Sequence, residues 1–242
     1  MCKMIINADD FGYSCAVNYG IMDAHLNGVL TSATLLTNTP GFKHAAALVK
    51  DCPSLGIGLH LNIAFGQPLT KGSTLTGKDG YFIKPGNLPS SHTYRMEEIQ
   101  AELEAQYQRF AEAMGQKPTH LDSHLFTTDS NPVMAAAARE LAEKYRLPLR
   151  NYDIPGFPHV DFVQFRTYHG EPGLSYVYDN IEDIASRPYV ELMSHPAYVD
   201  SYLLKSSSYN VQRLAELDFL ISSETKKMIK EYSIELINYS RI

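Results

Sequence analysis

The sequence contains no tryptophan, only three cysteines and no long hydrophobic run. The number of cysteines is odd and no two of them form a C-x-x-C pair, so we expect neither a disulfide framework nor a structural zinc site. The three are Cys2, Cys15 and Cys52. No apolar stretch reaches the roughly 20 residues that a membrane helix needs. The first residues run straight into a strand-like segment without the cleavage pattern of a signal peptide. These absences predict a cytoplasmic protein with no membrane partner.

The charge pattern lacks any block of Lys and Arg residues. The formal net charge is -6, with both signs interspersed, which argues against a nucleic-acid partner but not against a neutral substrate such as a sugar. The length of 242 residues is within the range of one α/β barrel, and a hydrophobic content of 44% can supply a large core. We therefore expect a single domain over residues 1–242.

Short strand-like runs alternate with helical segments along the chain. The patterns predict strands at 3–8, 31–37, 55–61, 119–124, 147–150, 190–194 and 233–237. They predict helices at 14–27, 41–50, 94–114, 132–146, 209–218 and 223–231. This alternation indicates an α/β protein with a mostly parallel sheet or barrel.

Two segments rich in Gly and Pro, 62–93 and 151–178, fit neither pattern. Loops of this length are uncommon in compact domains unless they serve a function, and each follows a predicted strand end, so we expect each to form a wall of the site. The second segment is rich in aromatic residues, which could stack on sugar rings, mediate dimer contacts or simply pack. These residues are Tyr152, Phe157, Phe162, Phe165, Tyr168, Tyr176 and Tyr178.

The most informative feature is that charged and imidazole side chains follow apolar runs at predicted strand ends. The residues are Asp9, Asp10, His60, His124 and His195. The carboxyl ends of barrel strands converge on one face, where such enzymes build their active sites. Two imidazoles and a carboxylate are also enough to hold a catalytic metal with coordination positions left open.

The alternation in residues 57–62 places Ile57, Leu59 and Leu61 on one strand face and His60 on the other. The leucine face should meet helices, so His60 should point into a barrel interior. A lone histidine there is more often a hydrogen-bonded core residue than a ligand. The polar residues at the other strand ends reverse that preference.

The pattern in residues 120–124 places two histidines on one predicted strand. His120 and His124 would lie about 13 Å apart at about 3.3 Å per residue, so they cannot both bind one ion. His124, at the carboxyl end, is the candidate ligand, and Asp122 could support a ligand from behind. His120 is predicted to be structural.

Asp9 and Asp10 would point to opposite sides of a regular strand, but at a strand end both can reach one site. One carboxylate could then bind an ion while the other takes a proton from water. Alternatively, the pair makes the turn and caps the helix at 14–27. His195 ends its strand before a proline and could act as a general acid or be structural.

Taken together, these segments resemble the YdjC-type carbohydrate deacetylase family. The matching segments are 7–12, 58–60, 118–124 and 194–197, with further similarity at 18–21, 28–32 and 214–217. The resemblance implies a distorted β/α (TIM-like) barrel that removes N-acetyl groups from chitooligosaccharides such as diacetylchitobiose.

The resemblance also implies a role for each candidate residue. Asp10, His60 and His124 would hold one divalent metal ion, Asp9 would be the general base and His195 the general acid. The family suggests magnesium, whereas the imidazole ligands make zinc, cobalt or manganese equally plausible.

The sequence departs from the family pattern just after Asp122-Ser123-His124. The family carries further histidines there, but this chain has Leu125, Phe126 and two threonines, so the surroundings of the metal should be more apolar. This departure bears on the exact sugar more than on the reaction class. Arg150 follows a predicted strand and could orient Asp9 or hold the acetate product.

Two other functions remain open at this point. A metal-dependent sugar isomerase or phosphoesterase could use the same barrel, although an isomerase would want more carboxylates and a two-metal phosphoesterase more histidines. A sugar sensor without catalysis could retain the pocket, but it would have no need of a base beside a metal. The oligomeric state is open, with a homodimer as one option.

Overall fold

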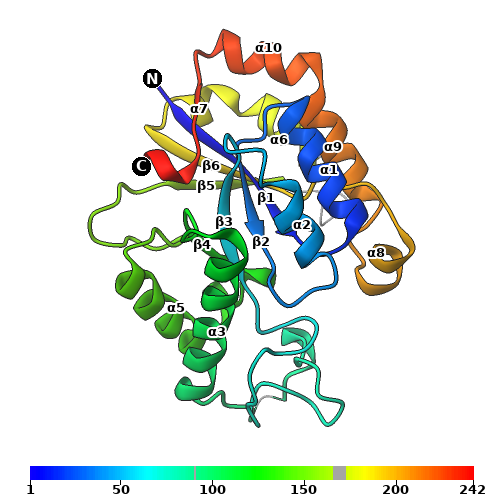
Figure 1. Cartoon of the computed structure of the whole chain (residues 1–242). Helices are drawn as coiled ribbons and strands as arrows, with labels where there is room; N and C mark the ends of the chain where they lie inside the picture. The colour runs from blue at the N-terminus through cyan, green and yellow to red at the C-terminus, as the bar shows by residue number, and fades with distance from the viewer. Residues whose placement is uncertain (90, 166–172) are drawn as a thin grey trace.

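The computed structural model describes residues 1–89, 91–165 and 173–242 and is built around a parallel sheet (Figure 1). The strand order is β4-β3-β2-β1-β6-β5, and β7 pairs with β1. The strands are β1 (Lys3–Phe11), β2 (Ser32–Leu35), β3 (Gly56–Leu61), β4 (Leu121–Ser123), β5 (Asp161–Gln164), β6 (Tyr189–Ser194) and β7 (Glu235–Leu236). β1 is thus a central strand, and the candidate residues His60, His124 and His195 lie at or just after the carboxyl ends of β3, β4 and β6.

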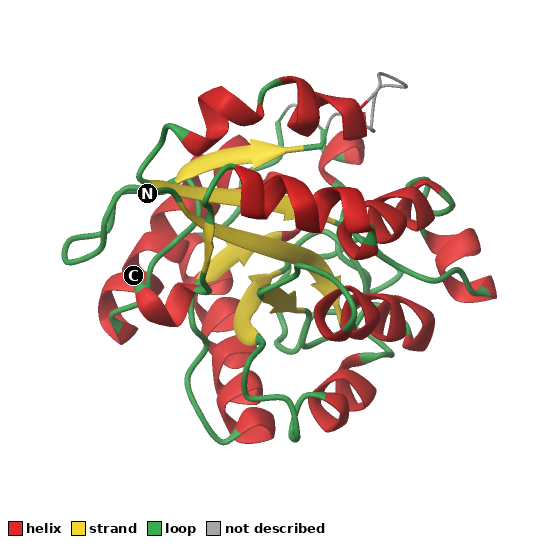
Figure 2. Ribbon diagram, turned by 90° about the horizontal axis from the view of Figure 1, so that it is seen from above, coloured by secondary structure: helices red, strands yellow, loops and turns green. Residues whose placement is uncertain are grey.

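Helices surround the sheet (Figure 2). The α-helices are α1 (Cys15–Leu26), α2 (Phe42–Leu48), α3 (Met96–Met114), α4 (Thr127–Ser130), α5 (Pro132–Tyr145), α6 (Gly173–Asp179), α7 (Ile181–Ala185), α8 (Ser201–Ser206), α9 (Gln212–Ile221) and α10 (Ser223–Glu231). Short 3-10 helices are η1 (Pro85–Asn87), η2 (His124–Phe126) and η4 (Tyr239–Arg241). The sheet is open between β4 and β5, which confirms the predicted distorted barrel.

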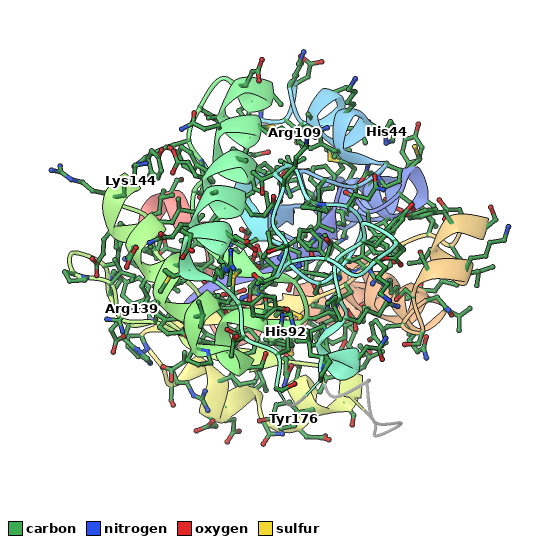
Figure 3. The ribbon with its side chains drawn as sticks, turned by 90° about the horizontal axis from the view of Figure 1, so that it is seen from below. His44, His92, Arg109, Arg139, Lys144 and Tyr176 are labelled. Carbon is green, nitrogen blue, oxygen red and sulfur yellow. The ribbon has the colours of Figure 1, made fainter. Side chains whose placement is uncertain are left out.

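The helix starts follow local chemistry. The Asn131 side chain accepts hydrogen bonds from the backbone N–H groups of Val133 and Met134, and Pro132 occupies the first turn of α5. Ser14 caps α1 in the same way. Figure 3 shows Arg139 and Lys144 projecting from the outer side of α5, away from the sheet. Among the described residues, no helix has the length and apolar character needed to cross a membrane.

The two faces of the sheet have different character. Ile57, Leu59 and Leu61 of β3 lie in the main hydrophobic core between sheet and helices, as their alternation predicts. The inner face is mostly polar, except for a small apolar cluster of Ile5, Ile237 and Tyr239. The barrel interior is therefore a buried polar compartment with an apolar floor.

The predicted strand at 147–150 is wrong. Leu149 makes only isolated bridges, one of them to Leu121 of β4. The Leu121 N–H donates to the Pro148 carbonyl, and the Arg150 N–H donates to the Leu121 carbonyl. Pro148 has no N–H to give a ladder and Asn151 turns away with a φ of 64°, so the pairing stops after one step.

The segment 151–178 is not one irregular loop, because it contains β5 and the start of the chain's α6 helix. β5 was missed because it has four residues flanked by Pro and Gly, too few for a clear period. The segment 62–93 remains largely irregular, with η1 and one bridge between Thr76 and Phe82. Tyr168 lies outside the described residues. Helices α7 and α8 were also missed, and α9 begins later than predicted.

Candidate active site

The end of β1 carries two adjacent buried carboxylates that line one cavity, Asp9 and Asp10. Asp10 has a left-handed backbone with a φ of 67°, and the register with β2 shifts between Ala8 and Phe11. This local twist lets both side chains reach one site instead of opposite faces of the sheet. A non-glycine residue in that region costs about 1–3 kcal/mol, a strain typical of functional sites. The expectation that both carboxylates converge is confirmed.

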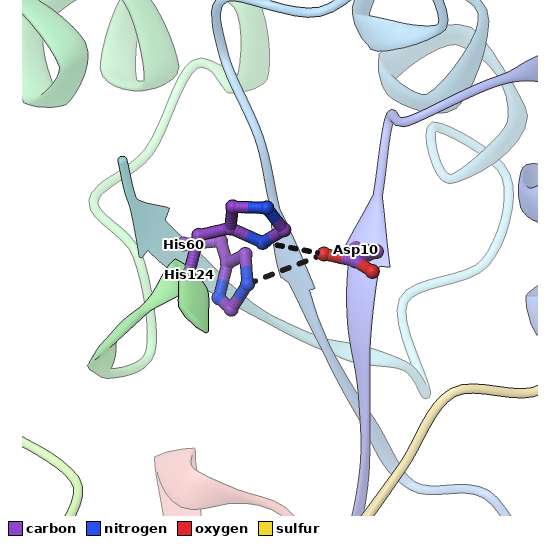
Figure 4. A group of neighbouring side chains, drawn as sticks. All are labelled: Asp10, His60 and His124. Atoms are coloured by element: carbon purple, nitrogen blue, oxygen red, sulfur yellow. Dashed lines mark ion pairs between the residues drawn. The ribbon is translucent and has the colours of Figure 1, made fainter. Parts of the chain in front are cut away.

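Asp10, His60 and His124 form a compact cluster at the ends of three segments (Figure 4). Asp10 Oδ1 lies 2.9 Å from His124 Nδ1 and 3.4 Å from His60 Nε2. One ligand atom from each residue lies within 4.8 Å of the others. Two imidazoles and one carboxylate are a donor set for a divalent ion with open positions, so these residues fit the implied metal.

Asp122 lies behind His60, with 2.6 Å between Asp122 Oδ1 and His60 Nδ1. This contact leaves Nε2 of His60 facing Asp10, which is the orientation a ligand needs. Burial opposes a charge on His60, but Asp122 and Asp10 outweigh it and raise its pKa to about 10. In the metal-free protein both ring nitrogens of His60 therefore carry a proton, and the ring is positively charged. Asp9, His60 and Asp122 form a second possible ligand set, but it would use the nitrogen that Asp122 already holds.

Asp9 is held by Arg150 through two parallel hydrogen bonds. Arg150 Nη1 donates to Asp9 Oδ2 at 2.8 Å and Nη2 donates to Oδ1 at 2.7 Å. The Asn7 side chain adds a third donor at 2.9 Å. Burial alone would raise the Asp9 pKa, but Arg150 holds it well below its usual range. Arg150 does not line the cavity, and it contacts Asp9 from behind the cavity wall.

Arg150 also contacts two further buried carboxylates, Asp122 and Glu191. Its Nη2 lies 2.9 Å from Asp122 Oδ2, and its Nε lies 2.8 Å from Glu191 Oε1. Glu191 was not predicted as a site residue. The alternation in β6 could have found it, because Glu191 shares a strand face with His195 and that face points inward.

Asp10 has its own arginine, Arg213 of α9, which sequence reasoning missed. Arg213 Nη2 donates to Asp10 Oδ2 at 2.7 Å, and its Nε donates to the Tyr209 carbonyl at 2.8 Å. Glu216, one turn along α9, accepts from the His195 backbone N–H and the Tyr209 hydroxyl. No spacing pattern marks these residues, because α9 reaches the site only through the tertiary fold.

His195 lines the same cavity as the cluster, with its ring edge-on to Tyr209 at 5.5 Å between centroids. Burial and the charge of Arg213 lower its pKa to about 4, so the resting imidazole is neutral at pH 7. His120 lies elsewhere, stacked on Tyr239 at 3.8 Å between ring centroids. A Cβ atom at Gly58 would come within 2.3 Å of the His120 ring, so the two residues fit each other. These contacts agree with the predicted structural place of His120.

The cavity has a volume of about 780 Å³, within the range of small-molecule sites. Phe65 and Lys84 come from the first long segment, while Gln164 and Phe165 come from the second, so both segments form walls as predicted. Other aromatic residues of the second segment pack against the core: Tyr152, Phe157, Tyr176 and Tyr178. The Phe162 ring packs on Phe126 and Arg150.

The wall above the cluster has an unusual backbone. Leu125 and Phe126, directly after His124, both have left-handed conformations, with φ values of 54° and 51°. Both line the cavity, and the Leu125 side chain is 53% exposed. The residues that replace the family's further histidines thus form an apolar shelf, Leu125–Phe126, beside the cluster.

Comparisons with known proteins agree over nearly the whole chain. A family model described as YdjC-like protein matches residues 3–231, ending before Tyr239. Carbohydrate deacetylase 2 of Listeria innocua serovar 6a is 49% identical over 99% of this chain and 98% of its own length. Chitooligosaccharide deacetylase of Proteus mirabilis is 36% identical over 98% of this chain and 96% of its own length.

One solved structure is similar in both sequence and fold. It is a protein of Enterococcus faecalis V583, named for a proposed role in cellobiose-phosphate cleavage. It is 31% identical, with a TM-score of 0.88, and the similarity covers 99% of this chain and 98% of that one.

Proposed function

The chain belongs to the YdjC-like family, and from this premise we propose that it removes an N-acetyl group from a chitooligosaccharide such as diacetylchitobiose with one divalent metal ion. The class of reaction rests on full-length relatives named carbohydrate deacetylase, so this chain is a hydrolase of that kind. The metal and the sugar are the finer part of the proposal. The observation that supports it best is the buried carboxylate Asp9 beside the Asp10–His60–His124 cluster.

Asp10, His60 and His124 would hold the ion. Bound there, it would polarise the acetyl carbonyl and lower the pKa of a water from about 15.7 toward 7. Magnesium follows from the family, whereas two imidazole donors favour zinc, cobalt or manganese. Arg213 fixes the outer oxygen of Asp10, which leaves Oδ1 directed at both imidazoles.

Asp9 would act as the general base. Its carboxylate is ionised at any working pH because Arg150 holds the pKa well below the usual range. It can therefore accept a proton from the attacking water, and the two hydrogen bonds from Arg150 keep it from turning away. Fixing the base in this way places it for the reaction before the substrate arrives.

His195 would protonate the departing amine, which is otherwise a poor leaving group. The resting imidazole is neutral at pH 7, with a pKa of about 4. Negative charge that develops on the substrate beside it would raise the pKa of His195, so the ring would take up a proton from solvent and then pass that proton to the departing amine. The Glu216 carboxylate holds the His195 backbone, so the ring stays at the cavity wall.

The isomerase or phosphoesterase and the sugar sensor are weaker alternatives. Within residues 1–89, 91–165 and 173–242 the two ligand sets share His60, which supports one ion and not two. A sensor would gain nothing from a base locked beside the cluster. A cytoplasmic location, a single domain over residues 1–242 and a homodimer remain predictions from the sequence.

The deciding experiment is acetate release from diacetylchitobiose by protein stripped of metal and then resupplied with Mg, Zn, Co or Mn. We expect no release from the stripped protein and recovery with at least one ion, which would also identify the preferred metal. No release with any ion, in a protein that binds the ion, would count against this substrate. Binding of the sugar without hydrolysis would favour the sensor.

A further inference from the structure

The C-terminal segment reaches the inside of the barrel from the end opposite the cavity. Glu235 and Leu236 of β7 pair with Lys3 and Met4 at the start of β1. The chain then enters the barrel, and Tyr239 is only 3% exposed. Its ring closes the floor of the polar compartment, in contact with Ile5 and Ile237.

The Tyr239 hydroxyl donates a hydrogen bond to Glu191 Oε2. The other oxygen of Glu191, Oε1, accepts from Arg150 Nε at 2.8 Å and Nη2 at 2.5 Å. Each oxygen of Glu191 is therefore bound by a different partner, one from the tail and one from the guanidinium. Glu191 is 1% exposed, so solvent does not replace a lost partner.

The same guanidinium holds Asp9. With Nε and Nη2 on Glu191, Nη1 and Nη2 are directed at the two oxygens of Asp9. The planar fork of Arg150 has a fixed geometry, so the place of Glu191 sets the orientation that Asp9 receives. An unbroken line of hydrogen bonds thus runs from the tail to the carboxylate at the cavity.

We propose that Tyr239 is a positioning residue for deacetylation, which acts through Glu191 and Arg150 on the carboxylate of Asp9. The inference rests on the proposed function, since Asp9 matters here as the base. Tyr239 touches neither the cavity nor the Asp10–His60–His124 cluster. Its effect should therefore appear mainly in the rate of the chemical step, with a much smaller effect on metal binding through the contact of Arg150 with Asp122.

The test is Tyr239→Phe, which removes one hydroxyl and keeps the ring stacked on His120. Loss of a residue that directly supports a metal ligand typically changes activity by 10–100-fold, and Tyr239 acts through two intervening residues, so we expect kcat to fall at the low end of that range, about tenfold. KM and the zinc affinity, measured by titration of the stripped protein, should change less than twofold. Tyr232→Phe, in the more exposed part of the same tail, is the matched control and should leave all three values unchanged.

A purely structural role would lower kcat, zinc affinity and thermal stability together and raise KM, and that pattern would overturn the proposal. An unchanged kcat in Tyr239→Phe would overturn it as well. If Tyr239→Phe does not fold, Glu191→Gln must show the same fall in kcat alone, and unfolding of both variants counts against the proposal. Failure of the wild-type protein to release acetate would instead count against the proposed function.

Discussion

Asp9 and Asp10 are the same residue type, one peptide bond apart, in two different surroundings. Asp9 faces Arg150, which binds both of its oxygens, and Asn7 adds a third donor. Asp10 faces the imidazoles of His60 and His124, and Arg213 binds only its outer oxygen. Both are buried, and both have a pKa well below the usual range.

The difference shows that neighbours, and not the aspartate itself, prepare a carboxylate for a task. A carboxylate clamped by a bidentate arginine keeps its position when charge nearby changes, which suits a base. A carboxylate with one oxygen directed at two imidazoles suits a metal ligand. The left-handed turn at Asp10 is what separates the two surroundings within one step of the chain.

The largest expected effect comes from removing the charge of Asp9. Asp9→Asn should lower kcat about a thousandfold, within the 10²–10⁴ range of general-base catalysis, because the amide cannot take the proton. Metal affinity should stay the same, since Asp9 is not in the cluster of three. Steady-state acetate release and metal titration check this, with the exposed Asp153→Asn as control. Loss of metal together with activity would erase the distinction between the two aspartates.

On the Asp10 side, His124→Ala should weaken metal binding. Loss of a supporting residue alone costs 10–100-fold in affinity, so loss of a ligand should cost at least about a hundredfold. The activity of His124→Ala should return in part at high metal concentration, whereas added metal should not restore the activity of Asp9→Asn. Calorimetric titration measures the affinity, and His159→Ala, an exposed histidine, serves as control. Unchanged affinity would remove His124 from the ligand set.

The metal affinity of the Asp10–His60–His124 cluster should also depend on pH, whereas the charge of Asp9 should not. The His60 pKa is raised to about 10 in the metal-free protein, so a metal must displace a proton from it. Affinity should therefore rise about tenfold per pH unit between pH 6 and 8, with about one proton released, measurable by calorimetry in two buffers. Asp9 is ionised throughout this range and therefore does not contribute to the pH dependence of the metal affinity. A flat profile would show that metal binding displaces no proton from His60 between pH 6 and 8.

The smallest effect concerns the Leu125–Phe126 shelf, which belongs to the open side of the site. Leu125→Ala should raise KM for diacetylchitobiose about fivefold, because part of an apolar contact with the sugar is lost. The value of kcat should hardly change, since the apolar side chains of the shelf make no hydrogen bond to Asp9 or Asp10. Kinetics of Leu125→Ala beside Leu204→Ala, an exposed leucine of α8, test this. A fall in kcat alone would contradict a binding role.

The site residues at the strand ends were predictable, because the period-two alternation and the residue types are visible in the sequence. Period two placed His60 inside the barrel and Asp122 behind a candidate ligand, but only the structure shows that the ligand it supports is His60. The convergence of Asp9 and Asp10 was expected from the nearby turn. The left-handed φ of Asp10 that produces this convergence could not be predicted from the sequence, since aspartate adopts that conformation only occasionally.

The supports of the site were mostly beyond sequence reasoning. Arg213 of α9 contacts Asp10 across 203 residues of sequence, and Tyr239 of the tail contacts Glu191. No local period links partners that far apart. Glu191 was readable from its strand face, but nothing in the sequence showed that it would share Arg150 with Asp9. The strand expected at 147–150 failed because Pro148 ends any ladder there.

The central position of β1 has a consequence for how the protein is made. This strand pairs with β2, which follows soon after, but also with residues 189–194 of β6 and with Glu235 and Leu236 of β7. Contacts so distant in sequence form slowly, because a long loop must close first. During synthesis, β1 leaves the ribosome before β6 and β7, so it completes its hydrogen bonds only after those strands have followed. A chain that ends before β6 therefore cannot hold a finished site.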